Sequence, residues 1–226
     1  MAVIKYDLAD SLYRIDLLLN GNPDTQGKRV DLPEVAHIPD VFNQKYTLVV
    51  AKVNFRFDTS DYKLPGMIHA ALLNELREIA CGWEQCKMVS VTGSRIVALY
   101  QTAMKSDVVD VINMVGNMSG IVDIVNYKCK DLNVYRIGLK VSVNYGSACL
   151  LAYGDARCNV MAGDKLMEEN ELQMDDSSSH SVFISEIIYN NLKDDYKQFF
   201  SGGGFGVAYS GNIINTGMSK WLESQK

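Results

Sequence analysis

Polar residues that could contact a metal or a nucleotide lie in two short stretches beside apolar runs: VNFRFDTS at residues 53–60 and TGSR at residues 92–95. The amide of Asn54 and the hydroxyl of Ser94 are neutral oxygen ligands. Asp58 and Asp61 are carboxylates, which Mg²⁺ or Mn²⁺ needs beside a phosphate chain. A metal site is therefore expected only if the two carboxylates turn back toward Ser94.

A glycine-rich run, FFSGGGFG, occupies residues 199–206. Glycine-rich loops can cradle phosphate, but this run lacks the Lys and the Ser or Thr of a P-loop and does not open a clear helix. It predicts a flexible turn.

The elements that must position the two polar stretches form a strand, a helix and a hairpin. A Val-rich and aromatic run at residues 46–57 predicts a covered strand. Apolar residues then recur at helical spacing from Met67 to Ile79, which predicts an amphipathic helix. Runs at residues 88–91 and 96–100 flank a tight turn in which Gly93 can take a positive φ.

A second helix and a second hairpin follow. The helix is expected at residues 106–126, where Gly116 and Gly120 indicate either a bend or close helix packing. Strands at residues 136–143 and 148–153 are expected to turn around residues 145–147. The order β-α-β-β-α-β-β predicts an α+β fold, an α/β sandwich with a ferredoxin-like or palm βαββαβ core.

The ends of the chain add elements to this core. Apolar spacing predicts a helix at residues 6–19, capped by Asp7 or Asp10, and a Pro-containing connector follows it. This helix packs either on a partner subunit or on the free face of its own sheet. We expect residues 1–44 to form this helix and connector, and residues 45–226 the core domain with its C-terminal extension. In the extension we expect a strand at 182–184, a helix capped by Ser185, a strand at 205–209 and a helical turn at 218–222 anchored by Trp221.

Composition limits the function classes. The 226 residues are 47% hydrophobic and 22% charged with a net charge of −5, which is typical of a globular protein and argues against a nucleic-acid grip through phosphates. We expect a cytoplasmic protein, since neither a signal peptide nor an apolar run long enough for a membrane span is evident. The five cysteines show no C-x-x-C pair, so reduced and mostly buried thiols are expected.

Four landmarks in order resemble the class III nucleotide cyclase catalytic domain: VNFRFDTS at 53–60, TGSRIVALY at 92–100, RIGLKVSVNYG at 136–146 and AGDKLMEENEL at 162–172. The segments IPDVFNQKYTLVVA at 38–51 and YSGNIINTGMSKWL at 209–222 resemble more specifically the bacterial uridylate and cytidylate cyclases of antiphage (Pycsar) signalling operons. The resemblance covers most of the chain. It implies the cyclase fold, dimers with active sites at the subunit interface, and nucleotide ligands.

The resemblance also assigns residue positions, and the chain departs from the family at each catalytic one. Asn54 and Ser94 stand where the family has its two metal-binding Asp residues. Met167 stands at the Asn position and Glu171 at the transition-state Arg position, where a carboxylate would repel phosphate charge. The positions expected to contact nucleotide are the following four: Phe55, Arg56, Gly93 and Arg95.

Three functions remain open at this stage. The first is a catalytically inactive cyclase-fold protein that needs no cofactor. It would act through a homodimer or a heterodimer with another cyclase-fold protein, and it would sense a nucleoside triphosphate or a cyclic nucleotide. The second is an active cyclase that makes 3′,5′-cyclic UMP or CMP from UTP or CTP with two Mg²⁺ or Mn²⁺ ions, using Asp58 and Asp61. The third is a protein interaction module without a ligand.

Overall fold

The computed structural model describes residues 7–20, 40–55, 62–130, 137–153, 157–162, 180–204 and 207–225. The core elements follow the order β1 (Asp40–Asn54), α2 (Lys63–Cys81), β2 (Cys86–Thr92), β3 (Arg95–Tyr100), α3 (Lys105–Lys128), β4 (Gly138–Tyr153) and β5 (Arg157–Ala162). The predicted order β-α-β-β-α-β-β is confirmed. Helix α1 (Leu8–Asn20) precedes this core.

The C-terminal extension holds the remaining elements: β6 (Ser181–Ile184), α5 (Glu186–Asn191), α6 (Asp194–Lys197), β7 (Phe200–Gly204), β8 (Val207–Gly211) and α7 (Thr216–Ser224). The expected strand and helix around residue 185 are confirmed as β6 and α5. Ser185 caps α5 as expected, since its hydroxyl accepts a hydrogen bond from the amide of Ile188.

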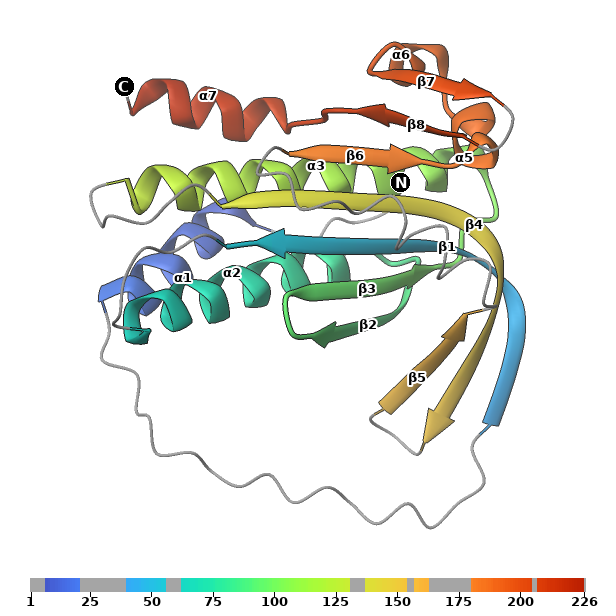
Figure 1. Ribbon diagram of the computed structural model, residues 1–226, viewed down its shortest axis with the longest axis horizontal. Helices are drawn as coiled ribbons and strands as arrows, with labels where there is room; N and C mark the ends of the chain where they lie inside the picture. The colour runs from blue at the N-terminus through green and yellow to red at the C-terminus, as the bar shows by residue number, and fades with distance from the viewer. Residues whose placement is uncertain are drawn as a thin grey trace.

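One eight-stranded sheet runs through the molecule in the order β2-β3-β1-β4-β6-β8-β7, with β5 paired to β4 outside this path. Strand β4 lies in the middle of this order, and β1 beside it is antiparallel to both β3 and β4, while β4 and β6 are parallel. Figure 1 shows the first half of β1, the last half of β4 and β5 extending as an arm beyond the part of the sheet that the helices cover.

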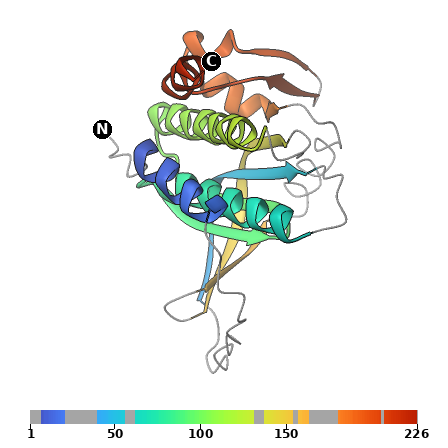
Figure 2. The same cartoon turned by 90° about the vertical axis from the view of Figure 1, so that its left-hand side faces the viewer.

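The helices lie on one face of the sheet. Figure 2 shows α1, α2 and α3 side by side, with α7 next to α3. The apolar core fills the space between this layer and the sheet, where Val49, Ala51 and Val53 of β1 meet Leu72 of α2 and Ile112 of α3. Because side chains alternate along a strand, the residues between these β1 positions point to the opposite face.

Helix α1 packs on α2 of its own chain, which neither predicted alternative described. Its Ile15 is fully buried. The guanidinium of Arg14 donates to both carboxylate oxygens of Glu75 at 2.7 and 2.9 Å, and Glu75 is 0% exposed. Asp7 is the cap, since its carboxylate accepts from the amide of Asp10.

Helix α3 is the described helix whose length and composition would allow it to cross a membrane, but 83% of its apolar window is buried inside the protein, as expected of a core helix.

Close packing, the second predicted alternative for the glycines of α3, is observed. A Cβ at Gly120 would lie 2.4 Å from the sulfur of Met218 in α7, and one at Gly116 would lie 3.0 Å from the Ile213 side chain. Met218 is the buried anchor of α7, while Trp221 is only half-buried against Tyr127.

Two predicted turns are wrong. Residues 145–147 lie inside the continuous strand β4, because β1 extends back to Asp40 and pairs with β4 across this segment, with Tyr46 opposite Gly146. The partner strand of the hairpin is β5, after residue 153. Residues 200–204 of the glycine run form strand β7, paired with β8, rather than a flexible turn.

Candidate functional site

The end of β1 meets the β2–β3 hairpin at one corner of the sheet. The amide of Val53 donates to the carbonyl oxygen of Ser94 at 2.9 Å, so Asn54 and Ser94 lie on neighbouring chain segments. Gly93, between the two strands of the hairpin, has φ +59°, as predicted for this turn. Strand β4 begins at the same corner, with Gly138 opposite Asn54. The fold therefore brings these predicted positions together.

Phe55 follows the last residue of β1 and packs toward the helix layer. Its ring meets the imidazole of His69 in α2 edge-on, with centroids 4.3 Å apart. Burial lowers the pKa of His69 below its usual 6.5, which favours the neutral ring. Phe55 thus has a packing partner on the helix side of the sheet.

Five further predicted positions lie outside the described residues: Arg56, Asp58, Asp61, Met167 and Glu171. Their roles stay predictions.

Three cations lie side by side on three adjacent strands at this corner. Lys52 of β1 pairs with Arg95 of β3 on one side and with Lys140 of β4 on the other. Directly opposed residues of antiparallel strands project from the same face. We call Arg95, Lys52 and Lys140 the cation row.

The cation row lies on the face of the sheet that the described helices do not cover. Neighbouring positions Ala51 and Val53 belong to the core on the helix side, so Lys52 points away from it. Lys52 and Arg95 are half-buried and Lys140 is 2% exposed. The ammonium group of Lys140 lies 5.9 Å from the ring centroid of Phe183 in β6.

A histidine with a buried side chain, His180, lies next to the cation row and links β4 to α3. The amide of Leu139 donates to Nδ1 of His180 at 3.1 Å, and Nε2 of His180 lies 2.8 Å from a carboxylate oxygen of Asp123 in α3. The ring therefore accepts at Nδ1 and donates at Nε2, a positioning contact between sheet and helix.

The described residues of this corner do not fit a divalent metal ion. Nowhere in the described ranges do three or more His, Cys, Asp or Glu side chains gather as a metal-binding group. Among the described residues, the corner offers the neutral side chains of Asn54 and Ser94 and no carboxylate.

Sequence reasoning found Arg95 but missed Lys52 and Lys140. The available signal was a single cation within each of two apolar runs, TLVVAKVN and GLKVSV. Only the register of β1, β3 and β4 shows that these cations are neighbours, and register is not evident from one sequence.

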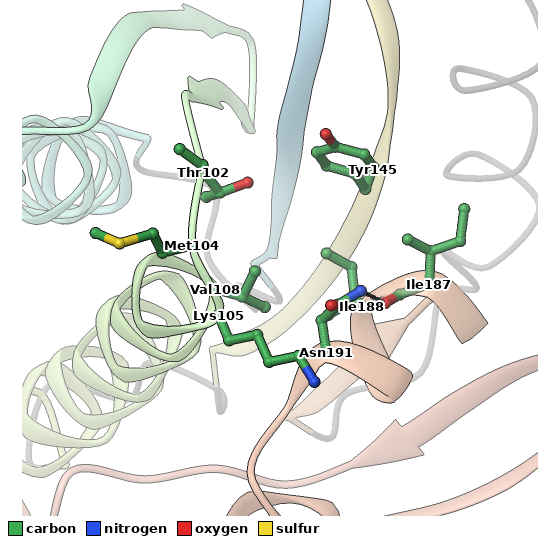
Figure 3. A pocket seen from close by; sticks show the side chains of 9 residues that line it. Thr102, Met104, Lys105, Val108, Tyr145, Ile187, Ile188 and Asn191 are labelled. Carbon is green, nitrogen blue, oxygen red and sulfur yellow. Dashed lines mark hydrogen bonds between the residues drawn. The ribbon is translucent and has the colours of Figure 1, made fainter.

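A cavity of about 200 Å³ lies at the opposite end of the strands from this corner. Figure 3 shows its lining, which comes from the segment before α3, from the first turn of α3, from β4 and from α5. Tyr145, Lys105 and Asn191 offer polar groups, while Val108 and Ile188 form an apolar wall. The predicted site residues that the structure describes, Asn54, Phe55, Gly93, Ser94 and Arg95, do not line this cavity.

The comparisons with known proteins support the fold. No family model and no curated protein matches the sequence. Solved structures do match: a class III adenylyl cyclase-like ATP-binding protein from Pseudomonas aeruginosa has a TM-score of 0.57 at 10% identity, and the guanylyl cyclase Cya2 has a TM-score of 0.57 at 11% identity. A bacterial light-regulated adenylyl cyclase matches with a TM-score of 0.52 at 10% identity.

The chain has the class III nucleotide cyclase fold. The match covers 77% of this chain and 95% of the Cya2 chain. The match to the Pseudomonas protein covers 80% of this chain but only 41% of that longer chain. The match to the light-regulated cyclase covers 84% of this chain and 58% of that chain. The fold class predicted from element order is thereby confirmed.

Proposed function

We propose that this chain is a catalytically inactive cyclase-fold protein that binds a nucleotide without cyclising it and acts as a dimer. The observation that carries the proposal is the charge of the corner where β1 ends: Asn54 and Ser94 are neutral, and three cations lie beside them. Cyclisation with two divalent ions needs carboxylates that hold the metals. The amide of Asn54 and the hydroxyl of Ser94 cannot supply that negative charge.

Nucleotide binding is favoured over a ligand-free interaction module by the fold and by one of the solved structures that share it. The solved structure from Pseudomonas is described as an adenylyl cyclase-like ATP-binding protein. Binding without cyclisation is the corresponding role that we propose for this chain.

Dimerisation is proposed because class III cyclases form their active sites between two subunits. The partner is either a second copy or another cyclase-fold protein. If Met167 and Glu171 stand at the family's Asn and Arg positions, neither half of a catalytic set is complete in this chain. It would then act on a partner through conformation, by favouring one state of the pair. On the sequence resemblance to the pyrimidine cyclases, we propose that this role belongs to cytoplasmic antiphage cyclic-nucleotide signalling.

The second candidate is an active uridylate or cytidylate cyclase with Mg²⁺ or Mn²⁺. It is favoured by the position of Asp58 and Asp61, which follow directly after the end of β1 in the sequence. This candidate requires both carboxylates to fold back toward Ser94 and to outweigh the cation row.

A thermal-shift series with sedimentation analysis tests the proposal. The protein is melted with each of the four nucleoside triphosphates, and its mass in solution is measured with and without the best of them. We expect one nucleotide to raise the melting temperature, since only a ligand of the folded state does so, and a dimer to be present. No shift with any nucleotide would leave the interaction module as the better account, and a monomer under all conditions would contradict the dimer.

A further inference from the structure

We propose that Cys81 and Cys86 form a dithiol site that a hydroperoxide oxidises to an internal disulfide, with Cys81 as the attacking sulfur and Cys86 as the resolving one. Cys81 is the last residue of α2, and Cys86 is the first residue of β2. Both thiols are free in the structure. Strand β2 reaches the hairpin of Gly93 and Ser94 only at its other end, so the dithiol is separate from the proposed nucleotide site.

A short turn, residues 82–85, brings the two sulfurs together. The amide of Cys86 donates to the carbonyl oxygen of Trp83 at 3.0 Å, so the chain reverses direction before β2 begins. The carbonyl oxygen of Gln85 accepts from the amide of Gln101 at 2.9 Å, which ties the turn to the end of β3. Trp83 is 4% exposed and anchors the turn in the core. The turn is therefore held at both ends, and a hydrogen bond joins the two thiols.

The surroundings of Cys81 suit the attacking sulfur. Its side chain is exposed, so a small oxidant reaches the sulfur from solvent. The hydrogen bond from Cys86 lowers the pKa of Cys81 to about 7, and the charge of Arg77 acts in the same direction. Partial burial and the carboxylate of Glu78 oppose this shift without cancelling it. A large share of Cys81 is therefore thiolate at neutral pH, and the thiolate is the form that peroxides oxidise.

The surroundings of Cys86 suit the resolving sulfur. It is half-buried, its sulfur lies 3.7 Å from the carbonyl oxygen of Met88, and it contacts the hydroxyl of Tyr100. The hydrogen bond with Cys81 and burial raise the pKa of Cys86 above its usual range. This thiol therefore keeps its proton and is shielded from direct oxidation, but it lies next to the sulfur of Cys81.

The oxidation has two balanced steps. The Cys81 thiolate attacks one oxygen of the hydroperoxide, the O–O bond breaks, and the released alkoxide or hydroxide takes up a proton from water. Cys81 is now a sulfenic acid. The sulfur of Cys86 then attacks the sulfur of Cys81, the S–O bond breaks, and the departing hydroxide leaves as water with the proton of the Cys86 thiol. Both thiols are oxidised to one disulfide, and the hydroperoxide is reduced to an alcohol or to water.

Cys129 is the contrasting thiol of the described residues. It follows α3 directly and is 1% exposed, and burial raises its pKa to about 11. Exposure and thiolate fraction are the properties that select a cysteine for oxidation, and both favour Cys81 over Cys129. Disulfides that form in reducing compartments are usually transient and redox-sensing, which is the kind of site that we assign to the dithiol.

Peptide mass analysis after treatment with hydrogen peroxide tests the proposal. Trypsin cleaves after Arg77 and Lys87, so one peptide, residues 78–87, contains both thiols. The reduced full chain is treated at neutral pH with a small excess of peroxide and then blocked with N-ethylmaleimide. We expect this peptide to lose the mass of two hydrogen atoms and to take up no maleimide, and dithiothreitol should restore both thiols. Its oxidation should be at least about tenfold faster than that of Cys129, followed in a chymotryptic peptide.

Three variants assign the roles of the sulfurs. Cys86→Ser keeps a hydrogen-bond donor but cannot close a disulfide, so Cys81 should stop at the sulfenic acid, which dimedone traps. Cys81→Ser should leave Cys86 reduced. The matched control Cys129→Ser removes a buried thiol outside the dithiol and should form the internal disulfide like the parent chain.

The parent peptide reports the disulfide directly, so this part of the test depends on no variant. A peptide that stays reduced while free cysteine in the same solution is oxidised would overturn the proposal. A disulfide that links two copies of the chain instead of one peptide would do so too. Oxidation of Cys86 in Cys81→Ser at the rate of the parent chain would overturn the assignment of Cys81 as the attacking sulfur.

Discussion

At the scale of single residues, two thiols interact where α2 turns into β2. Cys81 is exposed at the end of α2, and Cys86 begins β2. A hydrogen bond from Cys86 lowers the pKa of Cys81 to about 7, while the same contact and burial raise the pKa of Cys86 above its usual range. Cys81 is therefore the thiolate of the pair, and thiolates are the reactive form of cysteine.

Alkylation by iodoacetamide as a function of pH tests this assignment. The thiolate fraction of Cys81 grows as pH rises through its pKa, so its alkylation rate should reach half of its maximum near pH 7. In Cys86→Ala the hydrogen bond is absent, and the midpoint should move up toward the usual 9.0. Peptide mass analysis identifies the labelled residue. A midpoint that is the same in both proteins would show that Cys86 does not set the pKa of Cys81.

The candidate site could be predicted only in part at this scale. The hairpin turn at Gly93 and the meeting of Asn54 with Ser94 followed from local sequence and from family resemblance. The cation row did not, because it depends on which residue of β1 lies opposite which residue of β3 and β4. One step of register would place Lys52 on the opposite face, and local sequence does not fix that step.

At the scale of elements, a buried ion pair attaches α1 to the helix layer. Glu75 is fully buried, and Arg14 and the Ser11 hydroxyl both contact its carboxylate. Lys128 of α3 adds a second link by donating to Asp16 at 2.5 Å. Removing Arg14 would leave a buried carboxylate without its charged partner, which is the costly way to break such a pair.

Urea unfolding of Arg14→Gln measures this attachment. We expect a loss of about 2 to 3 kcal/mol, less than for a fully buried pair because Arg14 is 37% exposed. The matched control is Arg77→Gln, which breaks an exposed pair with Glu78 and should change stability by at most about 0.5 kcal/mol. Equal effects of the two substitutions would contradict the role of Arg14 in holding α1.

Two positions of strand β7 require glycine, one for its backbone conformation and one for both its conformation and its close neighbour. Gly202 and Gly203 have φ of +89° and +90°. A Cβ on Gly203 would lie 2.2 Å from the ring of Tyr209, whereas one on Gly202 would have 3.6 Å to its nearest neighbour. The Tyr209 ring also stacks on Tyr189 of α5, with centroids 3.7 Å apart.

Two alanine substitutions separate these causes. Gly202→Ala should cost about 1 to 2 kcal/mol from its backbone conformation alone. Gly203→Ala should cost clearly more, because it also displaces the Tyr209 ring from its stack. Thermal unfolding compares the two variants. A larger loss for Gly202→Ala would mean that the ring contact does not constrain β7.

At the scale of the whole molecule, the order of helices and strands was more predictable than the residues at which the strands begin and end. Helical periodicity identified α2 and α3, and the turn chemistry of Gly93 identified the first hairpin. Strand β4 was divided in the prediction because residues 145–147 contain turn formers, yet pairing with β1 keeps the segment extended. Strand β7 was missed because glycines carry no side-chain periodicity. Strand pairing decided both cases against local preference: with the distant β1 for β4, and with the adjacent β8 for β7.

We expect the molecule to keep the cyclase fold and to bind nucleotide without cyclising it. The fold is shared with known cyclases at about 10% identity, so residue chemistry must decide activity. In the described part of the chain, that chemistry is the cation row beside Asn54 and Ser94.

Product analysis tests this most directly. The purified protein is incubated at high concentration with each nucleoside triphosphate and Mn²⁺, and the nucleotides are separated and quantified. We expect every nucleotide to be recovered unchanged. A cyclic mononucleotide that accumulates with the parent chain and disappears in Asp58→Asn and Asp61→Asn would contradict the account, and it would identify an active cyclase whose metal ligands follow β1.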